Sequence, residues 1–132
     1  MADQSKLSSL ISLAYYGESA EIYELLSQGA VDPNITDAEG MTALHAAVQQ
    51  GHLDVVRVLI AAEASINRRN TAGLTPIFML AGCPLDRQVA MIGELVEAGA
   101  SLRAAARNGV TAEQLLFDVG GTELREWLAA RH

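Results

Sequence analysis

The amino-acid sequence predicts an all-α fold, a solenoid in which two-helix units stack into one continuous core. Three observations indicate it. The chain repeats with a spacing of 33 residues, each repeat holds two short apolar helices separated by a glycine, and threonine recurs where the first helix begins. A unit of this size cannot bury its apolar faces alone, so neighbouring units must cover one another.

The repeat is defined by glycines that precede threonine by two residues. Gly40 and Gly73 are 33 residues apart, and Gly109 follows 36 residues later, which indicates a three-residue insertion in the third unit. We therefore expect a single domain, residues 1–132, made of four units: approximately 6–36, 37–69, 70–105 and 106–132.

The second unit shows the pattern most clearly. Gly40 allows a tight turn with positive φ, and the hydroxyl of Thr42 can satisfy an unpaired N–H at the start of a helix. Leu44 begins an apolar stripe on a helix of roughly two turns, which Gly51 ends. A second and more apolar helix is predicted over residues 53–60.

The third and fourth units follow the same order with changes. Thr75 and Thr111 are predicted helix caps, and Pro76 falls at the first helical position, where proline costs no hydrogen bond. The insertion near 82–88 breaks the first helix of the third unit, and Asp86 is predicted to cap the next helix. This insertion is interpreted either as a tolerated lengthening of a turn or as a partner-specific protrusion.

The stretches "GMTALHAAVQQGHLDVVRVLI" (40–60) and "GLTPIFMLAG" (73–82) closely resemble the ankyrin repeat, whose signature is a 33-residue period with a T-P-L-H-x-A core. The resemblance covers about residues 8–130. Phe78 departs from it by replacing the expected histidine, and the first and fourth units resemble capping repeats. The resemblance implies antiparallel helix pairs with hairpin-like loops along one edge, and a role in binding another protein.

The resemblance also implies which residues contact a partner, namely those at the loop tips and on the concave face of the inner helices. The loop residues are Ala38, Glu39, Met41, Thr71, Ala72, Leu74, Arg107, Asn108 and Val110. The inner-helix residues are Tyr15, Tyr16, Ala46, Gln49, Gln50 and Met79. Aromatic side chains such as the two tyrosines are enriched at protein interfaces.

The charge distribution restricts the kind of partner. The net charge is −7, and the whole acidic surplus lies in residues 1–63, so the first half is interpreted as facing a basic protein surface or as serving solubility. A nucleic-acid partner is not expected without a basic footprint, and a membrane is not expected because no apolar run approaches about 20 residues. The free protein is expected to be a monomer.

Catalysis is not expected from the residues present. The histidines and the lone cysteine lack metal-ligand spacing, and no nucleotide-binding loop or nucleophile motif occurs, so we expect no metal and no cofactor. By the resemblance, His45 ties one loop to the next and His52 belongs to the inter-helix turn. Arg68 and Arg69 are expected to pair with carboxylates on a neighbouring loop, and Cys83 is interpreted as a small buried side chain.

The predicted function is therefore that of a non-catalytic binding module, acting as an adaptor, an inhibitor or an immunity or regulatory protein. Two alternatives remain open: a structural or chaperone-like subunit of a larger complex, and a thiol-dependent sensor or enzyme that uses Cys83. The interrupted apolar stretch near the N-terminus and the single cysteine predict a cytoplasmic location. The excess of arginine over lysine indicates a bacterial, GC-rich genome.

Overall fold

The computed structural model describes residues 4–131, and residues 1–3 and His132, at the two ends of the predicted domain, lie outside them. The elements are α1 (Gln4–Tyr16), α2 (Ser19–Ser27), α3 (Ala43–Gln50), α4 (Leu53–Ala61), η1 (Pro76–Gly82), η2 (Leu85–Arg87), α5 (Gln88–Glu97), α6 (Ala112–Val119) and α7 (Thr122–Ala130). Here η1 and η2 are 3₁₀ helices.

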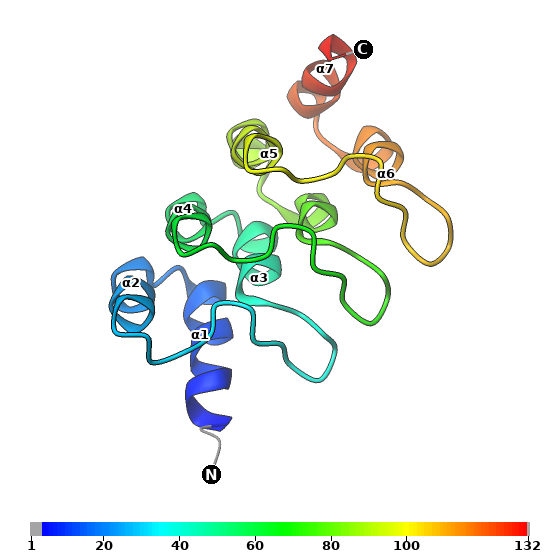
Figure 1. Cartoon of the computed structure of the whole chain (residues 1–132). Helices are drawn as coiled ribbons and strands as arrows, with labels where there is room; N and C mark the ends of the chain where they lie inside the picture. The colour runs from blue at the N-terminus through cyan, green and yellow to red at the C-terminus, as the bar shows by residue number, and fades with distance from the viewer. Residues whose placement is uncertain (1–3, 132) are drawn as a thin grey trace.

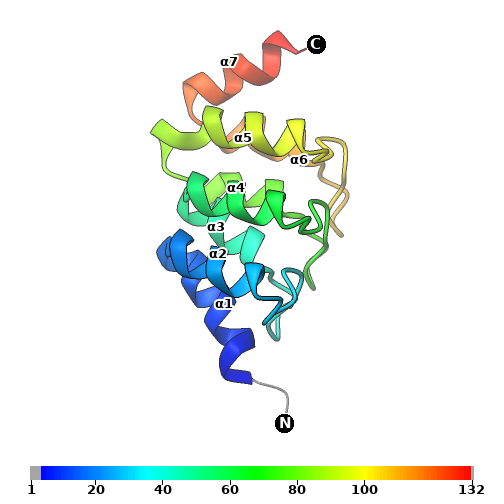
Figure 2. The same ribbon diagram turned by 60° about the vertical axis from the view of Figure 1, so that its left-hand side comes forward.

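The helices form two rows, and the loops project beyond one of them (Figure 1). The inner row, beside the loops, holds α1, α3, η1 and α6, and the outer row holds α2, α4, α5 and α7. Each member of a row contacts the corresponding helix of the next unit, so the units stack in chain order, as Figure 2 shows from a second direction. The predicted all-α solenoid of helix pairs is confirmed.

Several predicted helix ends are also confirmed. Thr42 and Thr111 each cap a helix, and each accepts a hydrogen bond from the backbone N–H three residues further on. Gly51 ends α3 with a left-handed backbone (φ 76°), a conformation that is costly for residues with a Cβ. The turn from α3 into α4 is thus encoded locally.

The first helix of the third unit departs from its counterparts, because residues 76–82 wind as a 3₁₀ helix. Pro76 lies in the first turn as predicted, but the Thr75 side chain makes no capping bond, and the Phe78 N–H donates instead to the Thr75 carbonyl at 3.1 Å. Phe78 has no ring nitrogen that could accept the cap bond, as a histidine would. A backbone N–H that donates to the carbonyl three residues earlier is the hydrogen-bond pattern of a 3₁₀ helix. The missing histidine therefore changes the local backbone.

The prediction that Asp86 caps the second helix of the third unit is wrong. Helix α5 begins at Gln88 with Arg87 at its cap position, and Asp86 lies one residue earlier, inside η2. A capping residue directly precedes the first helical turn. The insertion winds into a 3₁₀ turn, which places Asp86 too early to do so.

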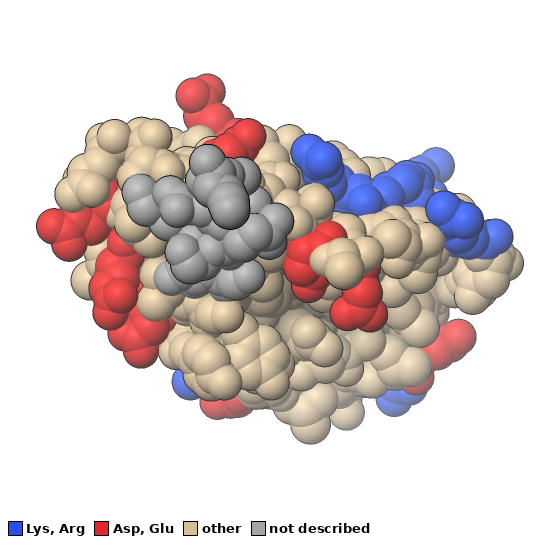
Figure 3. Space-filling view, turned by 90° about the horizontal axis from the view of Figure 1, so that it is seen from below, with Lys and Arg blue, Asp and Glu red and all other residues tan. Residues whose placement is uncertain are grey.

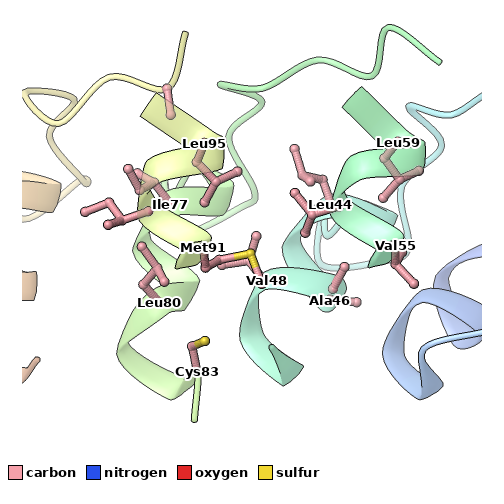
Figure 4. Packing of buried hydrophobic residues seen from close by; sticks show 14 of the residues in the cluster. Leu44, Ala46, Val48, Val55, Leu59, Ile77, Leu80, Cys83, Met91 and Leu95 are labelled. Atoms are coloured by element: carbon pink, nitrogen blue, oxygen red, sulfur yellow. The ribbon is translucent and has the colours of Figure 1, made fainter. Parts of the chain in front are cut away.

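The core runs through all four units. Leu59 on α4 and Leu95 on α5 occupy equivalent places, and both are fully buried (Figure 4). Aliphatic side chains from the inner row, such as Leu44 and Ile77, pack against them in the same cluster. The register deduced from the glycine and threonine spacing is therefore correct through the insertion.

Shortening either core leucine tests this register. Leu59→Ala or Leu95→Ala should lower the free energy of unfolding by about 2–5 kcal/mol, through lost burial and a residual cavity. Leu85→Ala is the control, because Leu85 is 67% exposed and should change stability by less than about 0.5 kcal/mol. Urea denaturation measures all three, and equal small effects would contradict the buried register.

Candidate functional site

Three hairpin loops of the same construction form the projecting edge of the molecule: residues 37–41, 70–74 and 106–110. In each, the N–H of the first residue donates to the carbonyl of the last, at 3.1, 2.9 and 2.9 Å. Their glycines, Gly40, Gly73 and Gly109, all have positive φ. Such turns need a residue without a Cβ, so the sequence positions the loops directly.

Side chains hold the first two hairpin loops rigid. Asp37 Oδ1 accepts the N–H groups of Glu39 and Met41, at 2.9 and 3.0 Å. Asn70 Oδ1 does the same for Ala72 and Leu74 at 3.0 Å each. Because these bonds already order the backbone, less entropy is lost when a partner binds to the loops.

The hairpin loops are also bonded to one another. The Thr71 N–H donates to the Glu39 carbonyl at 3.0 Å, and the Arg107 N–H donates to the Ala72 carbonyl at 3.5 Å. The three loops are thereby joined into one row, which we call the loop row.

His45 connects the inner row to this row of loops. The Thr42 N–H donates to His45 Nδ1 at 3.1 Å, so Nδ1 is an acceptor and Nε2 carries the proton. Nε2 donates to the Leu74 carbonyl of the next hairpin loop at 2.9 Å. Burial holds the pKa of His45 below its usual range, although the Leu74 bond and the Asp37 charge oppose this. The predicted scaffold role of His45 is confirmed.

His52 plays a similar part at the opposite end of α3. Its Nε2 donates to the Tyr15 carbonyl at 3.0 Å and so ties the second unit to the first. Gly17 (φ +79°) makes room for this ring, because a Cβ there would lie 2.7 Å from His52 Nδ1. His52 thus makes a bond between units, as His45 does.

The insertion of the third unit joins three units together. The buried Gln88 side chain donates from Nε2 to the carbonyls of Leu80 and Cys83, at 3.2 Å each, and accepts the Gly121 N–H at 3.0 Å. Arg87 Nη1 donates to the Gly51 carbonyl at 3.0 Å. The insertion thus has an internal structural role that the sequence did not reveal.

Cys83, within this insertion, is 4% exposed. Burial raises the pKa of its thiol to about 11, because the thiolate is poorly solvated there; the Arg87 charge opposes this effect and Asp86 adds to it. The thiol therefore stays protonated near neutral pH and is a poor nucleophile. Its geometry agrees with the interpretation as a small buried side chain.

Most of the predicted contact residues are accessible. Those classed as exposed are Tyr15, Tyr16, Ala38, Glu39, Gln49, Thr71, Ala72, Arg107 and Asn108, and those half-buried are Met41, Gln50, Leu74, Met79 and Val110. Tyr15 and Tyr16 stack edge to face with centroids 5.1 Å apart, and 71% of Tyr16 is exposed.

Two sequence expectations need correction. Ala46 is only 4% exposed, because close packing of the inner helices covers it, so it offers almost no side chain to a partner. Leu74 is half-buried against the core and its carbonyl accepts the His45 bond, so its contact with a partner stays a prediction. The expected ion pair of Arg69 is also wrong, because the side chain forms none with a described carboxylate. Its Nη1 donates instead to the carbonyls of Gly73 and Ala105, at 2.8 and 2.6 Å, which the adjoining loops bring within reach.

Sequence reasoning missed exposed apolar residues of the fourth unit. Phe117 and Val119 on α6 are 47% and 50% exposed. Aligning Gly120 with Gly51 places Val119 at the position of Gln50, so extending the register by one unit would have found it. Phe117 also lines an open groove of about 590 Å³ between α6 and α7.

Two kinds of feature are absent from the described part of the chain. Within residues 4–131, His, Cys, Asp and Glu side chains form no group of three or more that could hold a metal ion. None of the helices in that range is long and apolar enough to cross a membrane. The ordered loop row and the inner helices beside it remain the candidate site.

Comparison with known proteins matches this architecture. A family model described as "Ankyrin repeats (3 copies)" matches residues 10–106. The RelA-associated inhibitor of Mus musculus is 33% identical over 104 residues, covering 78% of this chain and 12% of that protein. Ankyrin repeat domain-containing protein 63 of Mus musculus is 34% identical over 97 residues, covering 73% and 25%.

A third relative is named for an activity. The 2-5A-dependent ribonuclease of Mus musculus is 40% identical over 75 residues, which cover 57% of this chain and 10% of that protein. The chain thus spans between 10% and 25% of the length of these three relatives. The similarity concerns the repeats.

Thr75 and Thr42 provide a matched test of helix capping. Thr75 Oγ1 is buried with no hydrogen-bond partner among the described residues, so Thr75→Val should leave stability unchanged or raise it by about 1 kcal/mol. Thr42→Val removes the cap of α3 and should cost about 1–2 kcal/mol. Thermal and urea denaturation measure both, and similar losses would show that the Thr75 hydroxyl is satisfied.

His45 should make stability depend on pH. Its folded pKa lies below the unfolded value of about 6.5, so the unfolded chain takes up the proton first. The free energy of unfolding should fall as pH drops below about 6.5, with a slope of at most about 1.4 kcal/mol per pH unit.

The control for this pH dependence is His45→Gln. Gln114 completes the cap of α6 with Thr111, so glutamine can cap without titrating. The variant should lose the bond to Leu74 and be less stable at pH 7, with a flatter profile between pH 7 and 5. An unchanged profile would assign the pH dependence to other groups.

Proposed function

The chain belongs to the ankyrin-repeat family, and from that premise we propose that it is a non-catalytic module that binds one partner protein. The binding surface is the row of hairpin loops together with the adjoining ends of the inner helices. The observation that carries the proposal is the rigid loop row, whose backbone is bonded within and between loops while its tips stay exposed. Such a preformed surface loses little entropy on binding.

The residues that differ between units supply the contacts. Glu39, Thr71 and Asn108 stand on the loop tips, and Gln49 stands at the end of α3. Tyr16 adds an exposed aromatic ring of the kind that anchors interfaces. The acidic surplus of residues 1–63 favours a partner that is basic where it faces the first unit and the first hairpin loop.

The form of action that we propose is that of an inhibitor, adaptor or immunity protein, which acts by occupying a surface of its partner. One relative is itself named as an inhibitor, and it matches over most of this chain. The setting that we propose is the cytoplasm of a bacterium. The excess of arginine over lysine and the reduced, buried Cys83 support it.

Two tyrosines allow a controlled test. Tyr16 lies at the end of inner helix α1, and Tyr23, which is 63% exposed, lies on outer helix α2. Tyr16→Ala should weaken partner binding by about tenfold or more, the size typical of an aromatic anchor, and Tyr23→Ala should leave it unchanged.

The partner is first isolated by affinity capture from the native cell, and affinities are then measured by calorimetry. Circular dichroism checks that both variants fold. Loss of binding in Tyr23→Ala with normal binding in Tyr16→Ala would move the interface to the outer helices. Equal binding by the unsubstituted protein and both variants would show that the end of α1 lies outside the interface.

A further inference from the structure

The charge of the loop row changes from negative to positive along its length. The first hairpin loop carries Asp37 and Glu39, whereas the segments that form the second and third loops carry arginines: Arg68, Arg69, Arg103 and Arg107. Figure 3 shows Lys and Arg gathered toward the side from which the loops project, with much of the Asp and Glu on the opposite side. Positive charge therefore gathers at the second and third loops, although the net charge of the chain is −7.

Direct contacts place two of these arginines, Arg69 and Arg107, against the neighbouring loop. Arg69 Nη1 donates to the Ala105 carbonyl at 2.6 Å, which places its guanidinium beside the backbone that carries Arg103 and Arg107. Arg107 in turn lies against the second loop, because its Cγ is 3.0 Å from the place where a Cβ on Gly73 would stand. We call Arg68, Arg69, Arg103 and Arg107 the arginine patch.

The arginine patch is not neutralised from within the described part of the chain. Arg68, Arg103 and Arg107 are exposed, and none of them forms an ion pair with a described carboxylate. The ion pair between Arg57 and Glu94 joins α4 to α5 in the outer row, away from the loops. Adjacent like charges repel, so the patch favours a ligand that supplies negative charge.

We propose that the arginine patch docks an acidic segment of the partner protein, a proposal that rests on the proposed function above. Guanidinium groups bind carboxylates through paired N–H···O bonds, and the exposed arginines of the patch offer several such sites. The carboxylates of Asp37 and Glu39 repel the same segment, so its acidic part lies over the second and third loops and not over the first. The change of charge along the loop row therefore sets the orientation of the bound partner relative to the three loops.

A protein segment fits the arginine patch better than a nucleic acid does. Nucleic-acid binding rests on neutralising many successive phosphates. The patch spans two loops, and the carboxylates of the first loop interrupt any longer basic track. An acidic segment needs only a few carboxylates at the patch.

The test compares single charge reversals at two exposed arginines. Arg107→Glu alters the arginine patch, and Arg125→Glu, on α7 in the outer row, changes the net charge equally. The ¹⁵N-labelled full chain is titrated with hexaglutamate, with hexalysine and with a thymidine hexanucleotide at an ionic strength of about 0.15 M, where charges beyond about 8 Å are screened. Circular dichroism checks the fold of both variants.

Hexaglutamate should shift the backbone amides of residues 68–73 and 101–110, with affinity about tenfold weaker for Arg107→Glu and unchanged for Arg125→Glu. No response to hexaglutamate, or equal loss in both variants, would overturn the proposal. A stronger response of the same amides to the hexanucleotide would assign the patch to nucleic acid instead. If hexaglutamate binds as expected but no partner is captured, the proposed function fails and the acidic preference stands.

Discussion

The structure depends on one imidazole whose two nitrogens serve different units. His45 Nδ1 accepts the Thr42 N–H and completes the cap of its own helix, while Nε2 binds the Leu74 carbonyl of the next hairpin loop. Acceptance at Nδ1 requires a neutral ring, and burial favours that form by lowering the pKa of His45. One side chain therefore both caps its own helix and joins that unit to the next.

The two later units show what happens when that imidazole is missing. In the fourth unit Gln114 completes the cap with Thr111, so α6 remains an α-helix. In the third unit Phe78 cannot do so, the Thr75 hydroxyl stays unpaired, and the backbone tightens into η1. Gln88 from the insertion then binds the end of that helix and the turn of the fourth unit.

This arrangement separates the framework from the surface that varies. Hydrogen bonds that involve the backbone of the hairpin loops leave the side chains at their tips free to differ from unit to unit, from Glu39 in the first loop to Arg107 in the third. A partner that contacts the loop row therefore meets a rigid surface whose charge changes along its length. Specificity in such an interface comes from charge complementarity more than from affinity at any one contact.

The sequence by itself determined the elements whose causes are local. A glycine with positive φ, a capping threonine and an apolar stripe each act within one or two turns, so the stacked helix pairs, the loop positions and the burial of Leu59 could be predicted. The scaffold roles of His45 and His52 also followed, once their positions in the repeat were recognised.

Only the tertiary structure decided what depends on neighbouring units. The burial of Ala46, the carbonyl partners of Arg69 and the bonds of Gln88 arise from residues brought together across units, many of them more than thirty positions away along the chain. No local pattern distinguishes an exposed alanine from a covered one. The 33-residue spacing of the repeats predicted that the helix pairs stack. The packing between adjacent units determined which side chains remain exposed.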